Sequence, residues 1–178
     1  MKYNGIEFEA IVATPTCGKS YLCDKYPEKF VDMDELKLKL KYVIPENISR
    51  EELESTKGER TFPRRQTREE YMKAFYEKAE KFYREGKILI AAPHEESIEF
   101  FVNNNIKYCF VFPSNQMREE IKRRMILRGN PQKTVDENYD MFYEFYNQNI
   151  NEKRAAVHYQ FNKDEYLEDI LKKFGCDF

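Results

Sequence analysis

The stretch ATPTCGKS, at residues 13–20, decides how this chain of 178 residues is interpreted. It follows an apolar run, IEFEAIVATP, and precedes a segment with helical character. A small residue, four others, Gly-Lys and then Ser or Thr, placed between a strand and a helix, form a loop whose backbone N–H groups can surround phosphate oxygens. The helix N-terminus adds its positive dipole end. The stretch predicts a nucleotide-phosphate site, and the alternative is an ordinary strand-to-helix turn.

Each position of this loop has an expected role. Gly18 allows the backbone to approach a phosphate, Lys19 is expected to neutralise the β- and γ-phosphates, and the Ser20 hydroxyl can bind Mg²⁺. Cys17 is interpreted as a small side chain that fits the loop, with a redox switch as the less favoured alternative. The loop begins with Ala instead of Gly, and Pro15 stiffens it. The residues expected to contact the nucleotide here are Ala13, Thr14, Pro15, Thr16, Cys17, Gly18, Lys19, Ser20 and Tyr21.

Strand patterns alternate with helical patterns along the rest of the chain. Five short apolar segments have strand character, at residues 7–14, 29–33, 87–92, 107–112 and 155–161. Helices are predicted in LKLKLKYVI at 36–44, after a Thr67–Glu70 capping box, in EESIEFFVNNN, after Thr134 with Glu137, and after Asn162 with Glu165. The alternation predicts an α/β fold of three layers, with helices on both faces of a parallel sheet.

Length and composition exclude several classes of protein. The length suits one domain, at 1–178, and the formal net charge of −2 argues against a general nucleic-acid coat protein. The four cysteines form no CxxC pair and accompany only two histidines, so they predict reduced thiols and neither a zinc site nor a disulfide framework. No stretch approaches the ~20 apolar residues of a membrane span. We therefore expect a soluble, cytoplasmic protein with no membrane partner.

An acidic pair follows the second predicted strand, in KFVDMDEL. Two residues apart on a strand, Asp32 and Asp34 would lie on the same side. Ligands bind at the carboxyl ends of parallel strands, where a carboxylate can hold Mg²⁺ or accept the proton of an attacking hydroxyl. The alternative is that one of them, Asp34 in preference, caps the following helix.

Basic charge is concentrated in two stretches. Residues 57–68, KGERTFPRRQTR, carry five positive residues and one negative, and residues 115–133 carry six positive and two negative, so each has a net charge of +4. Either stretch could be a solvated surface. Arginine also suits phosphoryl oxygens, because its planar fork gives bidentate charge-assisted bonds. The arginines that follow the fourth strand are Arg118, Arg123, Arg124 and Arg128.

With these features the chain resembles the P-loop nucleotide and nucleoside kinase superfamily, the adenylate-kinase-like and shikimate-kinase-like proteins. The resemblance covers most of the chain in element order and is specific only in ATPTCGKS. It implies a five-stranded parallel sheet of order 2-3-1-4-5, an acceptor-binding insertion at about 39–85 and a lid at about 116–133. The pair Asp32 and Asp34 resembles the Asp-x-Asp of kinases that phosphorylate hydroxyls.

The resemblance also implies roles for site residues. Catalytic roles fall to Lys19, Asp34, Asp32, Arg124 and Arg128, and Mg²⁺ would depend on Ser20 and Asp32, because no Walker B aspartate ends the third strand. Arg118 and Arg123 would also reach the nucleotide. The third strand ends in AAPHEES, without the Asp-Gly-Phe-Pro-Arg pattern of adenylate-type kinases. Residues expected to contact the acceptor are Asp34, Arg60, Arg64, Arg65, Arg68 and His94; a surface or helix-capping His94 is the alternative, and His158 is interpreted as structural.

The leading functional hypothesis is an enzyme, a kinase that uses ATP and Mg²⁺. It would transfer the γ-phosphoryl group to a nucleoside, a nucleoside monophosphate or a similar small metabolite. Two alternatives stay open: a kinase that acts on the 5′-hydroxyl of a polynucleotide, to which the basic insertion and aromatic residues would bind, and a nucleotide-binding module without catalysis. The sequence carries features of both a hydroxyl and a phosphate acceptor, so it leaves that choice open.

Overall fold

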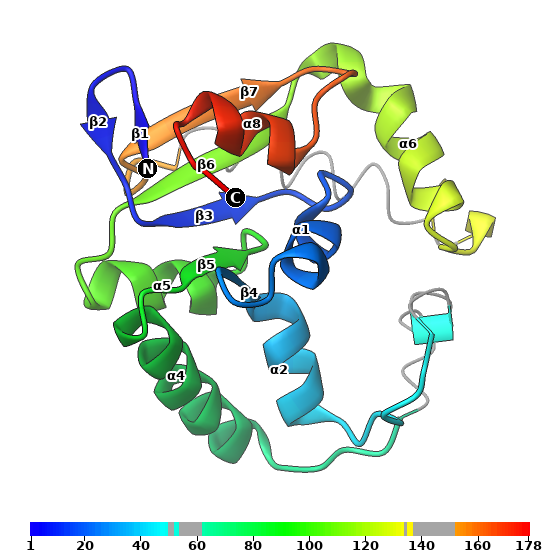
Figure 1. Cartoon of the computed structure of the whole chain (residues 1–178). Coiled ribbons are helices and arrows are strands. Elements are labelled where there is room, and N and C mark those ends of the chain that lie inside the picture. Colours follow the sequence, from blue (N-terminus) through cyan, green and yellow to red (C-terminus); the bar gives the residue numbers. More distant parts are fainter. Residues whose placement is uncertain (50–51, 54–61, 134, 137–151) are drawn as a thin grey trace.

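The computed structural model describes residues 1–49, 52–53, 62–133, 135–136 and 152–178 (Figure 1). A five-stranded sheet forms its centre, in the order β4-β5-β3-β6-β7. All neighbouring strands of this sheet run parallel. Counted along the chain this order is 2-3-1-4-5, so the predicted α/β fold and sheet order are confirmed.

The strands are short and the helices range from one to several turns. The strand bounds are β1 Lys2–Tyr3, β2 Ile6–Glu7, β3 Ala10–Ala13, β4 Phe30–Asp32, β5 Ile88–Ala91, β6 Tyr108–Pro113 and β7 Val157–Phe161. The helix bounds are α1 Lys19–Lys25, α2 Met33–Lys41, α4 Arg68–Arg84, α5 Glu95–Asn103, the 3-10 turn η1 Asn115–Met117, α6 Arg118–Leu127 and α8 Leu167–Lys173.

Helices cover both faces of the sheet, as the alternating pattern predicts. Side chains of successive strand residues point to opposite faces, so neighbours on β3 belong to different cores. On one face Ile11 packs in a cluster with Leu22 of α1 and Leu171 of α8. On the other face Val12 packs in a cluster with Phe75 of α4 (Figure 1). Strands β3 and β6 are buried along their whole length, which explains their near-continuous apolar sequences.

The strand register brings several loops to one edge of the sheet. Ala13 at the end of β3 lies opposite Val111 of β6, and Asp32 at the end of β4 lies opposite Ile90 of β5. The 13–20 loop therefore leaves the sheet at the same edge as Asp32 and the residue after β5, Ala92. This edge is formed by the carboxyl ends of the strands, where α/β proteins bind ligands.

The first predicted strand, residues 7–14, is wrong in its extent. Instead β2 pairs antiparallel with β1 in a hairpin, and only Ala10–Ala13 joins the main sheet as β3. Asn4 and Gly5 connect the hairpin strands, with φ angles of 47° and 83°. Two central residues with positive φ are what a tight two-residue hairpin needs, and Asn-Gly is its strongest sequence signal. The sequence therefore carries the signal for this hairpin at Asn4-Gly5.

Three predicted helices are confirmed by the structure. Thr67 and Glu70 form the capping box of α4: the Thr67 hydroxyl accepts from the Glu70 N–H, and the Glu70 carboxylate accepts from the Thr67 N–H. EESIEFFVNNN contains α5. The alternating LKLKLK stretch is part of α2, which buries Met33 and Leu40 against the core, so its position in the fold outweighs its period of two.

The start of the last helix differs from the prediction. Asn162 and Glu165 do form a turn, in which the Asn162 N–H donates to the Glu165 carboxylate. Helix α8 begins later, at Leu167, with Tyr166 as its N-cap and the Tyr166 N–H donating to Asp169. The predicted Thr134–Glu137 cap lies outside the described residues. None of the described helices is long and apolar enough to cross a membrane.

Candidate functional site

The 13–20 loop holds an unusual backbone conformation between β3 and α1. Gly18 is the N-cap of α1 with a φ of 96°, and Thr16 has a φ of 64°, which is uncommon for a residue with a side chain. The first backbone bond into α1 runs from Leu22 N to Gly18 O. A helix leaves its earlier N–H groups without intrahelical partners, so they face the loop.

Lys19 is buried behind the loop, with only 7% of its surface exposed. Its ammonium donates to the carbonyls of Ala13, at 3.0 Å, and Thr14, at 3.3 Å. The Lys19 Nζ also lies 3.7 Å from a carboxylate oxygen of Asp34. The cation is thus fixed at the centre of the loop by two carbonyls at the end of β3 and by a carboxylate in the first turn of α2.

Asp32 and Asp34 have different hydrogen-bond partners, and the helix cap is not the residue that was predicted. Asp32, not Asp34, caps the following helix: its Oδ1 accepts from the N–H groups of Asp34 and Glu35. Its other oxygen accepts from the Ser20 hydroxyl at 2.9 Å. Since β4 ends at Asp32 and α2 starts at Met33, the two aspartates do not alternate along one strand.

Asp34 lies in the first turn of α2 and reaches across to the next strand. Both of its carboxylate oxygens lie 3.0 Å from the Ala92 N–H, just beyond the end of β5. Together with Lys19 this contact fixes the carboxylate, yet 30% of its side chain stays exposed. Asp34 is therefore an oriented, accessible acceptor beside the ammonium of Lys19.

Two hydroxyls of the loop have no partner within the protein as described. The Oγ1 atoms of Thr14 and Thr16 are buried, and no hydrogen bond to either is found among the described residues. Buried hydroxyls are normally bonded, so unused donors at a loop of this kind are notable. Cys17 is different, because its burial raises the pKa of its thiol and keeps it protonated at neutral pH, which disfavours the redox-switch alternative.

A pocket of about 280 Å³ opens beside the loop, on the side of α6. Its walls mix backbone of the loop with cationic and aromatic side chains. Three apolar or aromatic residues on its rim reach solvent: Tyr21 is 61% exposed, Leu127 71% and Tyr166 45%. The lining residues are Thr16, Gly18, Lys19, Ser20, Tyr21, Arg124, Leu127, Arg128 and Tyr166.

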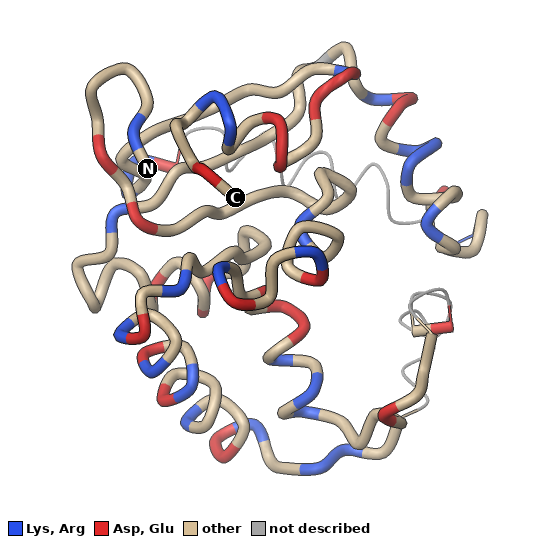
Figure 2. Tube along the Cα trace, in the orientation of Figure 1, with Lys and Arg blue, Asp and Glu red and all other residues tan. Residues whose placement is uncertain are grey.

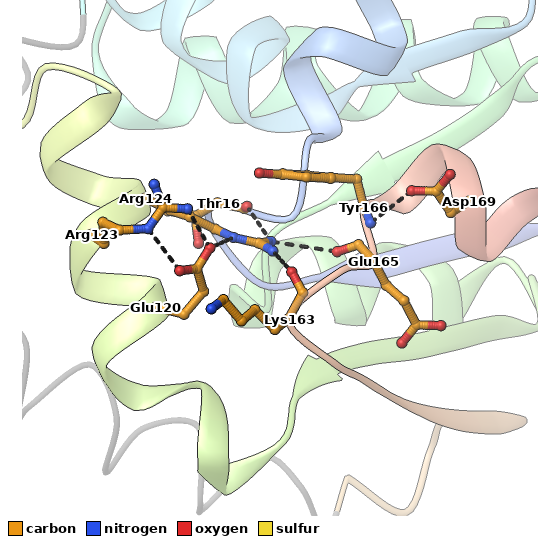
Figure 3. A network of polar contacts seen from close by, with 8 residues as sticks. All are labelled: Thr16, Glu120, Arg123, Arg124, Lys163, Glu165, Tyr166 and Asp169. Atoms are coloured by element: carbon orange, nitrogen blue, oxygen red, sulfur yellow. Dashed lines mark hydrogen bonds and ion pairs between the residues drawn. The ribbon is translucent and has the colours of Figure 1, made fainter.

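Arg124 connects α6 to the loop and to the segment before α8 (Figure 3). Its guanidinium donates to Glu120 at 2.9 Å and to the carbonyls of Thr16, Lys163 and Glu165, and lies 4.2 Å from the centre of the Tyr166 ring. The residue is only 6% exposed. In this arrangement Arg124 is a clamp whose donors are directed at the protein itself, and its predicted catalytic role stays a prediction.

The other α6 arginines lie nearer to solvent. Arg123 forms a bidentate pair with Glu120, with both N–O distances at 2.7 Å. The two arginines together hold the pKa of Glu120 down at about 2, chiefly through these hydrogen bonds. Arg128 lines the pocket, and Arg118 is exposed at the start of α6. The contacts of these arginines with a nucleotide stay a prediction. The lid at residues 116–133 also stays a prediction.

The described part of the basic stretch at 57–68, which is residues 62–68, lies against the C-terminal end of α2. We call residues 62–68 the basic strap: Tyr42 and Arg64 form an antiparallel bridge, and the Arg65 N–H donates to the Lys41 carbonyl. Figure 2 shows Lys and Arg positions gathered on the C-terminal half of α2 and on this strap. Arg64, Arg65 and Arg68 are exposed, and Arg60 lies outside the described residues.

His94 is the N-cap residue of α5, but its side chain makes no capping hydrogen bond. It follows Ala92 by two residues, so it lies at the same sheet edge as Asp34. Partial desolvation lowers the pKa of its imidazole, and the nearby Asp34 carboxylate opposes that shift. The structure thus places an exposed His94 near Asp34, and its expected contact with the acceptor stays a prediction.

The structure adds residues that the sequence did not single out. Tyr166 and Leu127 form walls of the pocket, and Glu120 anchors Arg124. Glu120 precedes Arg124 by four residues, a spacing that favours a helical ion pair and was a usable signal. The sequence around Tyr166 contains no such signal, because the position of Tyr166 beside the loop depends on the long-range hydrogen bond from Leu167 N to Cys17 O.

Comparison with known proteins gives little. No protein-family model and no curated protein matches the chain. Among solved structures, the chain is similar to an uncharacterized protein from Eubacterium ventriosum, with 13% sequence identity, 93% of this chain and 97% of that chain covered, and a TM-score of 0.47. The fold assignment therefore rests on the sheet order and register described above.

Proposed function

We propose that this chain is an ATP-dependent phosphotransferase of the P-loop kinase type, which transfers the γ-phosphoryl group to a nucleoside, a nucleoside monophosphate or a similar small acceptor. The observation that carries the proposal is the joint position of Lys19 and Asp34 at the carboxyl edge of the sheet, 3.7 Å apart. Phosphoryl transfer needs a cation beside the phosphates and a group that orients the attacking substrate. Lys19 can supply the first and Asp34 the second.

On the nucleotide side, the loop amides and Lys19 would bind the phosphates. The carbonyls that now accept from Lys19 are weak neutral partners, which a phosphate oxygen would replace with a charge-assisted bond. The unpartnered Thr14 and Thr16 hydroxyls offer two further donors. The neighbouring pocket, with Tyr166, Leu127 and Tyr21 at its rim, has the apolar walls that suit a nucleobase.

Magnesium fits the donors next to Lys19. The Ser20 hydroxyl and the Asp32 carboxylate lie 2.9 Å apart, and Mg²⁺ typically takes one or two such oxygens together with water and substrate phosphates. When bound, Mg²⁺ would neutralise charge on the β- and γ-phosphates.

On the acceptor side, Asp34 is the residue that would contact the attacking group. Its fixed carboxylate can accept a hydrogen bond from a hydroxyl and so orient the oxygen toward the γ-phosphorus. Positive charge for the transition state would come from Lys19, with Arg128 at the pocket wall as a second source. Arg124 would act indirectly, by holding the Thr16 carbonyl.

The test is transfer from γ-labelled ATP to a panel of acceptors, alongside direct measurement of ATP binding. Lys19→Met should reduce the transfer rate at least 100-fold, because transition-state charge stabilisation of this kind is worth factors of ~10²–10³. The matched control is Lys39→Met, since Lys39 is 63% exposed and pairs with Glu35 on the same helix. Thermal unfolding of each variant separates lost function from lost fold.

The competing proposal is a nucleotide-binding module without catalysis. It predicts ATP binding with no transfer and no hydrolysis, and binding that is insensitive to Asp34→Asn. Tight ATP binding with no labelled product from any acceptor would reject the phosphotransferase in favour of that module. Absence of ATP binding would reject both.

A further inference from the structure

We propose that the acceptor is a hydroxyl compound that carries its own phosphate, of the kind found at the 5′-hydroxyl end of a nucleic acid strand or in a nucleoside 3′-monophosphate. Its hydroxyl would lie at Asp34 and its phosphate on the basic strap. This inference rests on the proposed phosphotransferase and names the substrate class of that same site.

The charge beside Lys19 favours a hydroxyl over a phosphate as the attacking group. Asp34 is accessible there, Asp32 follows the end of β4, and no arginine of the described chain is recorded within ion-pair distance of either carboxylate. A phosphate acceptor placed against Asp34 would bring a second anion to a carboxylate whose recorded cation, Lys19, is already needed by the nucleotide phosphates, and this repulsion costs binding energy. A hydroxyl donates to the carboxylate and meets no such cost.

Positive charge increases along α2 away from Asp34. Lys37, one turn on, and Arg68 of the basic strap share a single carboxylate, Glu96, at 3.2 Å and 3.8 Å. Two cations on one anion leave a net positive charge next to the acceptor position. Glu96 lies in the first turn of α5, so its two ion pairs connect α5 to α2 and to the strap.

Beyond this pair, the strap presents cations without counter-charges. Arg64 and Arg65 are exposed, and within the part of the chain that the structure describes no acidic side chain pairs with either. Their backbone is fixed, because Arg65 N donates to Lys41 O and Arg64 forms a bridge with Tyr42. The Lys41 ammonium lies over the rings of Tyr42 and Tyr71. An ordered backbone with exposed guanidiniums is suited to phosphate, which arginine binds in a bidentate manner.

The spacing matches a ligand with a hydroxyl and a phosphate at different points. Asp34 and Lys41 are seven residues apart on α2, which at 1.5 Å per residue is about 10 Å along the helix axis. A nucleic acid strand advances about 3.4 Å per nucleotide, so its first one to three phosphates would fall within that length. Tyr42 and Tyr71 are each only 5% exposed, so they support the lysine and offer no stacking surface for bases. Recognition would therefore be of the phosphate and not of the base.

The reaction is a simple displacement. The acceptor oxygen forms the new bond to the γ-phosphorus of ATP, and the bond from that phosphorus to the β,γ-bridging oxygen breaks. ADP leaves, and the hydroxyl proton is released to water. The strap takes no part in these bonds and acts only by holding the acceptor.

The experiment measures transfer from γ-labelled ATP to four acceptors with purified full-length protein: a nucleoside, its 3′-monophosphate, its 5′-monophosphate and a short 5′-hydroxyl oligonucleotide. We expect label on the 5′-hydroxyl of the 3′-monophosphate or the oligonucleotide, with kcat/KM at least 10-fold above that of the nucleoside. A higher value for the oligonucleotide identifies a strand end as the acceptor, and a higher value for the 3′-monophosphate identifies a small molecule.

Variants of the strap test its role. Arg64→Gln and Arg65→Gln should each lower the preference for the phosphorylated acceptor about 10-fold, mainly through KM, and make that preference less sensitive to salt. Arg84→Gln is the matched control, because Arg84 is an exposed arginine of α4 paired with Glu80. It should behave as the unmodified chain does.

Three results would overturn the inference: label on the phosphate of the 5′-monophosphate, a kcat/KM for the nucleoside equal to that of both the 3′-monophosphate and the oligonucleotide, or strap variants that match Arg84→Gln. All three leave ATP binding and its dependence on Lys19 intact. Loss of ATP binding itself would reject the proposed function first, so the two failures are distinguishable.

Discussion

The two basic stretches carry the same net charge in the sequence and use their arginines in different ways. In α6, Arg124 is buried, donates to a carboxylate and to three backbone carbonyls, and lies over the ring of Tyr166. On the basic strap, Arg64 and Arg65 are exposed on an ordered backbone. The difference teaches that charge density in a sequence does not distinguish a structural arginine from one that is available to a ligand. Burial and existing partners make that distinction.

The difference between the two stretches is tested most directly by replacing the buried arginine, Arg124, with an uncharged residue. Arg124→Met should lower the free energy of unfolding by about 3 kcal/mol, because breaking a buried ion pair leaves uncompensated polar groups. Here the groups left behind are Glu120 and the carbonyls of Thr16, Lys163 and Glu165. Chemical denaturation measures the loss.

The control for this change is built into the same helix. Arg123 pairs with the same carboxylate but its side chain is 56% exposed, so Arg123→Met should leave the unfolding midpoint nearly unchanged. Equal losses for Arg123→Met and Arg124→Met would show that the carboxylate contact matters and the carbonyl contacts do not.

A smaller effect should appear on acidification. Both arginines hold the pKa of Glu120 at about 2 in the folded chain, below its ordinary value of 4.5. Between these values the unfolded chain binds more protons than the folded chain, so stability falls as the pH falls from about 4.5 to about 2. Glu120→Gln should flatten the pH dependence of the unfolding midpoint in that window. Glu119→Gln, at an exposed neighbouring position, should keep the original slope.

The smallest effect on stability is expected from substitutions in the basic strap. The double variant Arg64→Gln, Arg65→Gln should keep the thermal midpoint of the original chain, since neither guanidinium has an ion-pair partner among the described residues. Differential scanning calorimetry tests this. A drop as large as that of Arg124→Met would mean that the two stretches are alike and would end the comparison.

Much of the fold was predictable because it follows from local patterns. The strand bounds near Ile88–Ala91 and Tyr108–Pro113 come from apolar runs that only a doubly covered strand can bury. The loop of residues 13–20 was identified by its spacing alone. The hairpin of β1 and β2 was missed although Asn4-Gly5 signals it, because the apolar pattern from Ile6 onward reads as one strand.

The details of the site were harder to predict, since they depend on contacts between distant segments. Asp32 and Asp34 are equivalent as sequence, and their roles diverge only because α2 begins between them and Ala92 N lies within reach of Asp34. Arg124 is one of four arginines in a row of charges, and its burial depends on the segment before α8, about 40 residues later. No pattern within either stretch carries that information.

The backbone of the 13–20 loop has a thermodynamic consequence. Pro15 lies next to Thr16, which adopts a φ of 64°, and the proline ring fixes its own φ, so the loop has less conformational freedom to lose at residue 15. A loop that is ordered before its ligand arrives pays little conformational entropy on binding. The ATP binding that we propose should therefore carry a smaller entropic penalty than binding by a glycine-rich loop. Calorimetry should find that penalty increased in Pro15→Gly, with the heat of binding largely retained.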